Sequence, residues 1–255
     1  LINNINYINN NFYDLSIIIP VSLINVSEES LINFDYTLNN FFKVINNSNY
    51  KINICISHTE NEYNLLLDYI IENNNINYIF IKNPYNFNLG YNRNLYKYIN
   101  NSSKIMFVDM DIPLSKEIID TMIKKSEEFD IVKPYYQTLL NLNEKDKYNY
   151  IYNNVIPNKK PNKLYSITGG ITLFDKKILD NLGGYEEFNG YGHEDRCMDV
   201  LVLKKNYSVL RLDNKLIHLY HLQSEKNINS LIEIYNKQYY NCLWERTEKI
   251  DIHEC

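Results

Sequence analysis

Short apolar segments that alternate with helix-like segments constrain this chain more than any other feature of its sequence. Residues 15–21 (LSIIIPV) form an apolar run closed by proline, and comparable runs occupy 52–57, 76–81 and 104–108. The intervening stretches have the apolar spacing of helices, at 27–44, 61–71, 90–98 and 115–129. This alternation predicts βαβ units, an α/β fold and a mostly parallel sheet, whose ligands bind at the carboxyl ends of the strands.

The second part of the chain has a different composition and a less regular pattern of apolar residues. Residues 141–163 are polar and rich in tyrosine and contain two prolines, so we expect a long loop there. An apolar segment with a glycine pair (165–174), a short helix, a glycine-rich loop and a helix from Glu194 are expected next. They are followed by a strand near 216–221 and a final helix. The first dozen residues are of low complexity, and we expect a lead-in or a helix end rather than core.

Composition excludes several classes of protein. The formal net charge of −5, from 26 basic and 31 acidic side chains, argues against nucleic acid as the main partner. No run reaches the roughly 18 apolar residues that a membrane helix needs, and no segment resembles a signal peptide. The four cysteines form no C-x-x-C pair, which favours free thiols and a cytoplasmic location. The chain begins with Leu1, so we expect it to belong to a larger polypeptide.

Two carboxylates follow the apolar run at 104–108. Asp109 and Asp111 are two residues apart, so in extended chain both side chains point to the same side. At the carboxyl edge of a sheet such a pair is a natural site for a hard divalent cation. The alternative for this D-x-D pattern is a solvated turn between strand and loop.

A glycine-rich stretch leads into a second acidic pair. Gly190-Tyr191-Gly192-His193 runs directly into Glu194 and Asp195, where the helical pattern begins. Four glycines within ten residues indicate a loop that allows close approach, and carboxylates at a helix start are favoured by the helix dipole. We expect one of the two carboxylates to cap the helix and the other to face the cleft, where it can act as a general base.

Three further features remain. His218 and His221 end an apolar strand and can converge on a transition metal if the chain bends between them; surface histidines are the alternative. Gly169-Gly170 marks a strand bulge or the close approach of a ligand. Arg93, at a helix start, can pair with a diphosphate or be an ordinary surface residue. No G-x-G-x-x-G follows the first strand and no G-x-x-x-x-G-K-[ST] occurs, which weighs against dinucleotide and P-loop sites.

In this order (strand-proline, N-R, apolar-D-x-D, G-G, G-Y-G-x-E-D, H-x-x-H) the sequence resembles GT-A fold glycosyltransferases. The resemblance is closest to the galactosyl- and N-acetylgalactosaminyl-transferring branch, which holds the β-1,4-galactosyltransferase-like and chondroitin-polymerase-like enzymes. It covers residues 15–221 and is most specific over TGGITLFDKKILDNLGGYEEFNGYGHEDRCMD, from Thr168 to Asp199. It departs from the branch at Tyr191, where Trp is usual, and at His193, where a small residue is common.

The resemblance implies a Rossmann-like nucleotide-binding sheet with flanking helices and a smaller acceptor-side region. It implies one GT-A domain over residues 1–255, with a nucleotide-sugar-binding half at 15–135, a donor/acceptor and catalytic half at 136–223, and a C-terminal helix at 224–255. The residues implied to bind the donor are Pro20 and Val21 beside the base, Arg93 at the nucleotide or its diphosphate, Asp109 at the ribose or a metal-bound water, and Gly169, Gly170 and Tyr191 at the sugar.

The same resemblance implies the chemistry. Asp111, His218 and His221 would ligate Mn²⁺ (or Mg²⁺), Glu194 would bind a sugar hydroxyl, and Asp195 would be the general base. The implied activity is a metal-dependent inverting transfer of a hexose or N-acetylhexosamine from a UDP-sugar to a hydroxyl of a glycan, glycoprotein or glycolipid. A metal ion suits a diphosphate leaving group, and a carboxylate base suits a sugar hydroxyl of high pKa.

Two other functions compete with this one. A catalytically silent module that binds a sugar or a sugar nucleotide would keep the fold and lose the metal or base residues, yet Asp109, Asp111, Asp195, His218 and His221 are all present. A sugar nucleotidyltransferase needs a glycine-rich, basic loop after the first strand, and the loop here, VSLINVSEES, is acidic.

Overall fold

The computed structural model describes residues 4–6, 12–21, 28–58, 77–80, 88–136, 139–158, 166–188, 193–219 and 237–241. Eight strands of these residues form one sheet: β1 (Asn4–Asn6), β2 (Leu15–Val21), β3 (Ile52–His58), β4 (Asn77–Phe80), β5 (Lys104–Phe107), β6 (Ile131–Lys133), β8 (Thr172–Asp175) and β9 (Val209–Arg211). The strand order is β1-β4-β3-β2-β5-β8-β6-β9. Strands β4, β3, β2 and β5 are mutually parallel, whereas β8 runs antiparallel to both β5 and β6. The α/β fold with a mostly parallel sheet is thus confirmed.

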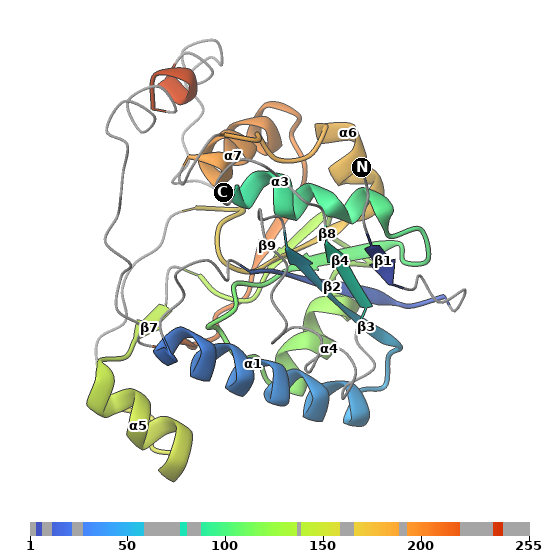
Figure 1. Ribbon diagram of the computed structural model, residues 1–255. Coiled ribbons are helices and arrows are strands. Elements are labelled where there is room, and N and C mark those ends of the chain that lie inside the picture. Colours follow the sequence, from blue (N-terminus) through green and yellow to red (C-terminus); the bar gives the residue numbers. More distant parts are fainter. Residues whose placement is uncertain are drawn as a thin grey trace.

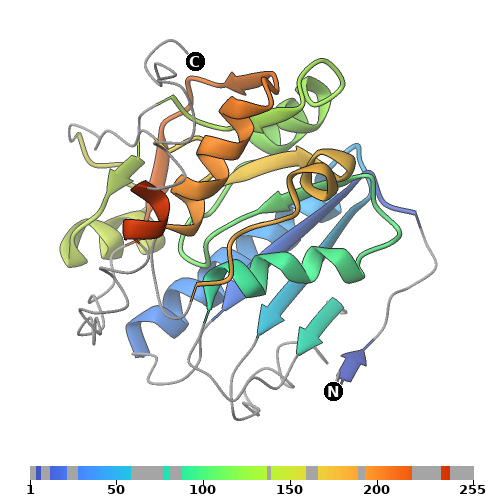
Figure 2. The ribbon, with the colours of Figure 1, turned by 90° about the horizontal axis from the view of Figure 1, so that it is seen from above.

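Helices cover both faces of this sheet (Figures 1 and 2). Helices α1 (Glu28–Asn47) and α4 (Lys116–Lys125) lie below it in Figure 1. Helices α3 (Leu89–Asn94), α6 (Lys176–Leu182) and α7 (Glu194–Lys204) lie above it. The 3₁₀ helix η1 (Leu95–Tyr98) continues α3. The molecule therefore has three layers, and each face of the sheet has its own apolar core.

Strand β2 shows how the sequence produces the two cores. Leu15, Ile17 and Ile19 pack with α1 and α4, whereas Ile18 packs on the opposite face with the aromatic ring of Phe107. The strand is therefore buried on both faces, which explains why its sequence is a continuous apolar run rather than an alternating one.

Pro20 is compatible with this central strand for a simple reason. Pairing of β2 with β5 ends at Ile18, whose carbonyl oxygen accepts from Val108 N–H, so Pro20 faces the side where β5 no longer pairs. Because proline has no N–H to donate, its position at the end of the ladder sacrifices no hydrogen bond.

A small two-stranded parallel sheet lies beside the main one. It pairs β7 (Leu139–Asn141) with β10 (Leu216–His218), and α5 (Glu144–Asn153) follows β7. The expectation of a long loop over 141–163 is therefore wrong for its first part. Asn143 caps α5 through Asp146 N–H, and Tyr150 and Ile151 pack on the small cluster formed by the two strands. The sequence of this helix is polar and rich in tyrosine. Only one narrow side of it is apolar, so the spacing of its apolar residues gives no clear helical signal.

Other expectations differ in detail. The first residues pair as β1 with β4, although a lead-in or helix end was expected, and β6 and β9 are strands too short for a periodic signal. The helix expected to reach 129 ends at Lys125, and turns follow. The helix expected at 61–71 lies outside the described residues, as does all of 224–255 except a helical turn at 237–241. Among the described residues, no helix combines the length and the apolar character needed to cross a bilayer.

We expect the core around Phe107 to dominate the stability of the upper layer. Phe107 is 1% exposed and its ring meets those of Tyr96, Phe174 and Tyr185 edge to face. Phe107→Ala should lower the free energy of unfolding by about 3–5 kcal/mol because it leaves a cavity. Urea denaturation measures this change. The matched control is Phe12→Ala at a ring that is 80% exposed, which should change the value by less than about 0.5 kcal/mol; equal losses would contradict this account of the core.

Candidate active site

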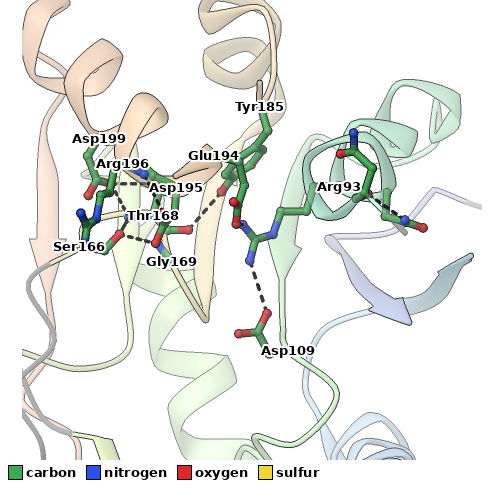
Figure 3. A network of polar contacts seen from close by, with 12 residues as sticks. Arg93, Asp109, Ser166, Thr168, Gly169, Tyr185, Glu194, Asp195, Arg196 and Asp199 are labelled. Carbon is green, nitrogen blue, oxygen red and sulfur yellow. Dashed lines mark hydrogen bonds and ion pairs between the residues drawn. The ribbon is translucent and has the colours of Figure 1, made fainter. Parts of the chain in front are cut away.

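The acidic motifs meet at the carboxyl edge of the central sheet. Asp109 and Asp111 follow β5, and Pro20 and Val21 end the parallel strand β2, so all four lie at the same edge. Helices α3 and α7 bring further polar residues to this edge from above. Figure 3 shows Arg93 of α3 reaching from one side and Glu194 of α7 from the other, with Asp109 beneath.

Arg93 joins the two acidic motifs. Its Nη2 lies 3.3 Å from Asp109 Oδ1 and its Nη1 lies 3.5 Å from Glu194 Oε1. The side chains of Arg93 and Glu194 are 2% and 8% exposed, whereas that of Asp109 is 37% exposed. Arg93 and Glu194 therefore form a buried pair, and Asp109 presents its carboxylate to the open side of the site.

Burial governs the electrostatics of this cluster. Desolvation raises the pKa of the Glu194 carboxyl above its ordinary value, although Arg93 opposes the shift. Desolvation likewise raises the pKa of Asp109, against the opposing effect of Arg93. Burial alone would lower the pKa of Arg93, but Tyr185, Asp109 and Glu194 outweigh it and raise that pKa, so the guanidinium stays charged.

The loop that follows α6 is held next to Arg93 by hydrogen bonds to α3. The Asn94 side-chain amide accepts from Tyr185 N–H and donates to Tyr185 C=O, both at 2.8 Å. The Arg93 guanidinium lies 4.9 Å above the centroid of the Tyr185 ring, a cation–π contact. The Tyr185 hydroxyl in turn donates to the Thr168 carbonyl oxygen at 3.1 Å. Tyr185 therefore ties α3 to the glycine pair that precedes β8.

Asp199 fixes the same segment to α7. Its carboxylate accepts from Ile167 N–H at 3.0 Å, from Thr168 N–H at 2.8 Å and from the Thr168 hydroxyl at 2.7 Å. Desolvation, together with the nearby Asp195, raises the pKa of Asp199 to about 6. Because this carboxylate accepts three hydrogen bonds from Ile167 and Thr168, its role is to hold the backbone before the glycine turn in place.

Gly169 and Gly170 form a turn just before β8, and the expectation that they lie within a strand is wrong. A Cβ on Gly169 would lie 2.6 Å from Asp195 Oδ2, so only glycine lets the backbone come this close to that carboxylate. Gly170 has a φ of +73°, and a Cβ there would lie 2.9 Å from the Tyr135 hydroxyl and 4.0 Å from Asp109 Oδ2. The turn is therefore close to both carboxylates, with Gly169 next to Asp195 and Gly170 near Asp109.

Helix α7 starts directly at the acidic pair. Its N-cap is His193, with a φ of +71° and no side-chain capping bond, so the expectation that Glu194 or Asp195 is the cap is wrong. Both carboxylates lie in the first turn, which the helix dipole favours. Asp195 Oδ1 accepts from Arg196 N–H at 2.8 Å, which leaves Asp195 Oδ2 on the side of Gly169.

The expected metal ligands are brought together in part. His218 Nε2 lies 3.1 Å from Asp111 Oδ2, and Leu219 N–H donates to Asp111 C=O at 2.9 Å. The end of β10 therefore lies beside the D-x-D motif, with His218 in contact with Asp111. His221 and the sugar-site candidate Tyr191 lie outside the described residues. Within the described parts of the chain, no group of three histidine, cysteine or acidic residues is arranged to hold a metal ion.

Sequence reasoning missed several residues of this site. Asp199 lies four residues after Asp195, so both carboxylates share one side of α7, and this spacing was a usable signal. Tyr185 follows Gly183-Gly184, at the start of the glycine-rich stretch, whereas Thr168 carries no local signal, because only the folded backbone brings it to Tyr185 and Asp199.

The fold has known relatives among solved structures. The chain is similar to Staphylococcus aureus TarS 1–349 in complex with UDP-GlcNAc, at 14% identity and a TM-score of 0.62, over 94% of this chain and 69% of that one. GalNAc-T7 with UDP, GalNAc and Mn²⁺ gives 12% identity and a TM-score of 0.62, over 92% and 48%. The mannosyltransferase PcManGT from Pyrobaculum calidifontis with GDP-Man and Mn²⁺ gives 10% and 0.55, over 93% and 66%. The chain thus has the GT-A fold.

A family model adds evidence from the sequence itself. Residues 151–225 match the model described as the N-terminal domain of galactosyltransferase, and this segment holds the glycine turn, the acidic start of α7 and His218. No curated protein matches the chain. The match and the fold confirm the resemblance: the chain has the GT-A fold, and residues 151–225 are similar to the N-terminal domain of galactosyltransferase.

The buried Arg93–Glu194 pair yields a prediction about stability. Arg93→Gln leaves Glu194 buried without its cation, which should lower the free energy of unfolding by about 3–5 kcal/mol. The pKa of Glu194, already raised by burial, should rise further, so the folded variant holds a proton that the unfolded chain releases. Its stability should therefore fall as the pH rises above the ordinary glutamate range, and the deficit should be smallest in acid. Urea denaturation between acidic and neutral pH measures this trend.

The control for this prediction is the double variant Arg93→Gln/Glu194→Gln, which removes both charges. It should recover part of the stability and lose the pH trend. A deficit in Arg93→Gln that does not change with pH would contradict the role given to Glu194.

Proposed function

We propose that this chain is a divalent-metal-dependent inverting glycosyltransferase. It would move a hexose or N-acetylhexosamine from a UDP-sugar to a hydroxyl acceptor, with Asp195 as the general base. The observation that carries the proposal is the proximity of the Gly169–Gly170 turn to both Asp109 and Asp195. A donor sugar over this turn would have its diphosphate toward the D-x-D motif and its reacting carbon toward the Asp195 carboxylate.

The donor set at Asp111 fits a hard cation. A carboxylate oxygen and an imidazole nitrogen lie 3.1 Å apart there, and both are atoms that Mn²⁺ accepts as ligands. Asp111 and His218 would therefore hold the ion, with His221 as the further ligand that the sequence suggests. When bound, Mn²⁺ or Mg²⁺ would neutralise the charge of the departing diphosphate.

Arg93 would act through the carboxylates that it contacts. It is buried and paired with Asp109 and Glu194, so we propose that it orients Asp109 toward the nucleotide or a metal-bound water. The same pairing would aim Glu194 at a hydroxyl of the donor sugar. Pro20 and Val21, at the end of β2, would flank the base.

The chemistry is a single displacement. The acceptor hydroxyl would give its proton to Asp195 as its oxygen forms a bond to the anomeric carbon, and the bond from that carbon to the diphosphate oxygen would break. UDP leaves with the electron pair. One carboxylate base on the side opposite the leaving group implies inversion of configuration at the anomeric carbon.

The solved relatives support a sugar nucleotide as donor, because their complexes hold UDP-GlcNAc, UDP with GalNAc, or GDP-Man. Two of these complexes also hold Mn²⁺. The UDP-sugar is our proposal for this chain, and UDP-galactose, UDP-N-acetylgalactosamine, UDP-glucose and UDP-N-acetylglucosamine all remain candidates. A glycan, glycoprotein or glycolipid acceptor and a cytoplasmic location stay predictions.

The first test is UDP release from these four donors, with GDP-mannose as a fifth, with and without Mn²⁺. We expect release from one UDP-sugar that needs the metal. Asp111→Ala should lower the rate by at least about 100-fold because it removes a metal ligand. The exposed Asp35→Asn on α1 should leave the rate unchanged. The absence of release from any donor, together with no Mn²⁺-dependent binding of UDP, would contradict the proposal and favour a silent binding module.

A second test isolates the base. Asp195→Asn should reduce kcat for sugar transfer by about 10²–10⁴-fold, since general-base catalysis contributes that much. Calorimetry should show that UDP binds this variant in the presence of Mn²⁺ as tightly as it binds the wild type. A kcat within a few-fold of wild type would rule Asp195 out as the base.

A further inference from the structure

A buried lysine contacts the glycine turn. Lys133, the last residue of β6, is 1% exposed, and its ammonium group donates to the carbonyl oxygen of Gly169 and, at 3.5 Å, to that of Ile171. Its Nζ also lies 4.5 Å from the centroid of the Tyr135 ring. Full burial of a lysine is rare unless the charge has partners. Here those partners are backbone carbonyls on both sides of Gly170.

Tyr135 reinforces the same contact. Its hydroxyl donates to the Gly169 carbonyl oxygen at 3.3 Å, so this one oxygen accepts from both side chains. Because the peptide unit is planar and trans, fixing the Gly169 carbonyl also fixes the direction of the Gly170 N–H, which points the opposite way. The orientation of the turn is therefore set by Lys133 and Tyr135.

The same turn borders the candidate active site. Gly169 approaches Asp195 Oδ2 so closely that a Cβ would lie 2.6 Å from it. A rotation or shift of the turn would therefore press on the carboxylate that we propose as the base, or move away from it. No other lysine of the described residues donates to the carbonyl groups of this turn.

We propose that Lys133 is a positioning residue of the active site, whose buried ammonium clamps the Gly169–Gly170 turn and holds it in register with Asp195. This inference rests on the proposed function, because the consequence of the clamp is the geometry of the transfer reaction. Lys133 acts through the turn and touches neither donor nor acceptor in this account.

The surroundings of Lys133 make the clamp sensitive to pH. The charged or titratable groups that face it come from four elements: Asp195 and Asp199 of α7, Arg211 of β9, Asp109 after β5, and Tyr135 after β6. Desolvation lowers the pKa of Lys133 to about 7, with Arg211 acting in the same direction and the carboxylates opposing it. The ammonium is therefore charged below neutral pH and loses its proton as the pH rises through neutrality.

The test compares Lys133→Met, Lys133→Arg and the control Lys104→Met. Lys104 opens β5 at the opposite edge of the sheet, and its ammonium also contacts a backbone carbonyl, that of Ser126, at 3.4 Å. Loss of a buried cation from its partners is destabilising, so Lys133→Met should unfold at a lower temperature than the wild type, and its activity and exchange are measured well below that temperature. Thermal unfolding checks this point for all three variants.

Activity gives the first readout. Lys133→Met should lower kcat by about 10–100-fold, as a displaced catalytic group does, with the affinity for UDP unchanged. Lys104→Met should match the wild type. The wild-type kcat should fall as the pH rises above neutral, and Lys133→Arg should retain activity there because a guanidinium keeps its charge. An identical kcat for wild type and Lys133→Met would overturn the proposal.

The second readout does not depend on activity. Amide hydrogen exchange over residues 166–172 should be faster in Lys133→Met than in the wild type, and unchanged in Lys104→Met and Lys133→Arg. Equal exchange rates in wild type and Lys133→Met would contradict the proposal that Lys133 holds the turn in place. If the wild type releases UDP from no donor, the proposed function fails, while the exchange experiment still decides whether the clamp exists.

Discussion

The buried guanidinium of Arg93 is the interaction on which the site depends. It bridges Asp109, which follows a strand of the first part of the chain, and Glu194, which begins a helix of the second part. A buried ion pair contributes little net stability, but the loss of one partner is costly. The value of this bridge is therefore geometric: it allows only one arrangement of α3, α7 and the end of β5, in which the two acidic motifs face each other.

The position of the glycine turn also depends on this arrangement, through contacts made by Tyr185 and Asp199. Tyr185 lies under Arg93 and donates to the Thr168 carbonyl, while Asp199 accepts both donors of Thr168. The turn that follows is thus held by α3, by α7 and, through Lys133, by β6. The D-x-D motif and the glycine turn lie on loops, whereas Asp195 lies in the first turn of α7, and strands and helices far apart in the sequence restrain those loops. Such restraint keeps a flexible, glycine-rich backbone in a defined position.

The sequence predicted most of the individual strands and helices around the site, but not the contacts between residues that are far apart in the chain. The apolar runs at β2, β3 and β5 and the helix from Glu194 were predictable because period and length signal them directly. The motifs at Asp109 and Glu194 were found, but their common partner Arg93 was expected at the diphosphate, because nothing in the sequence reveals its burial. Helix α5 was missed because only one narrow side of it is apolar, and β6 and β9 because three residues give no period.

The charge balance of the site explains why a cation belongs to the proposed function. Asp109, Asp111, Glu194 and Asp195 converge here, and the buried cations that offset them are Arg93 and Lys133. An anionic diphosphate that entered such a site alone would meet carboxylates at short range, and like charges repel strongly where water is excluded. A divalent ion at Asp111 and His218 would reverse the sign of the local field. We therefore expect the metal to precede or accompany the donor, because only the metal-bound site is electrostatically complementary to a nucleoside diphosphate.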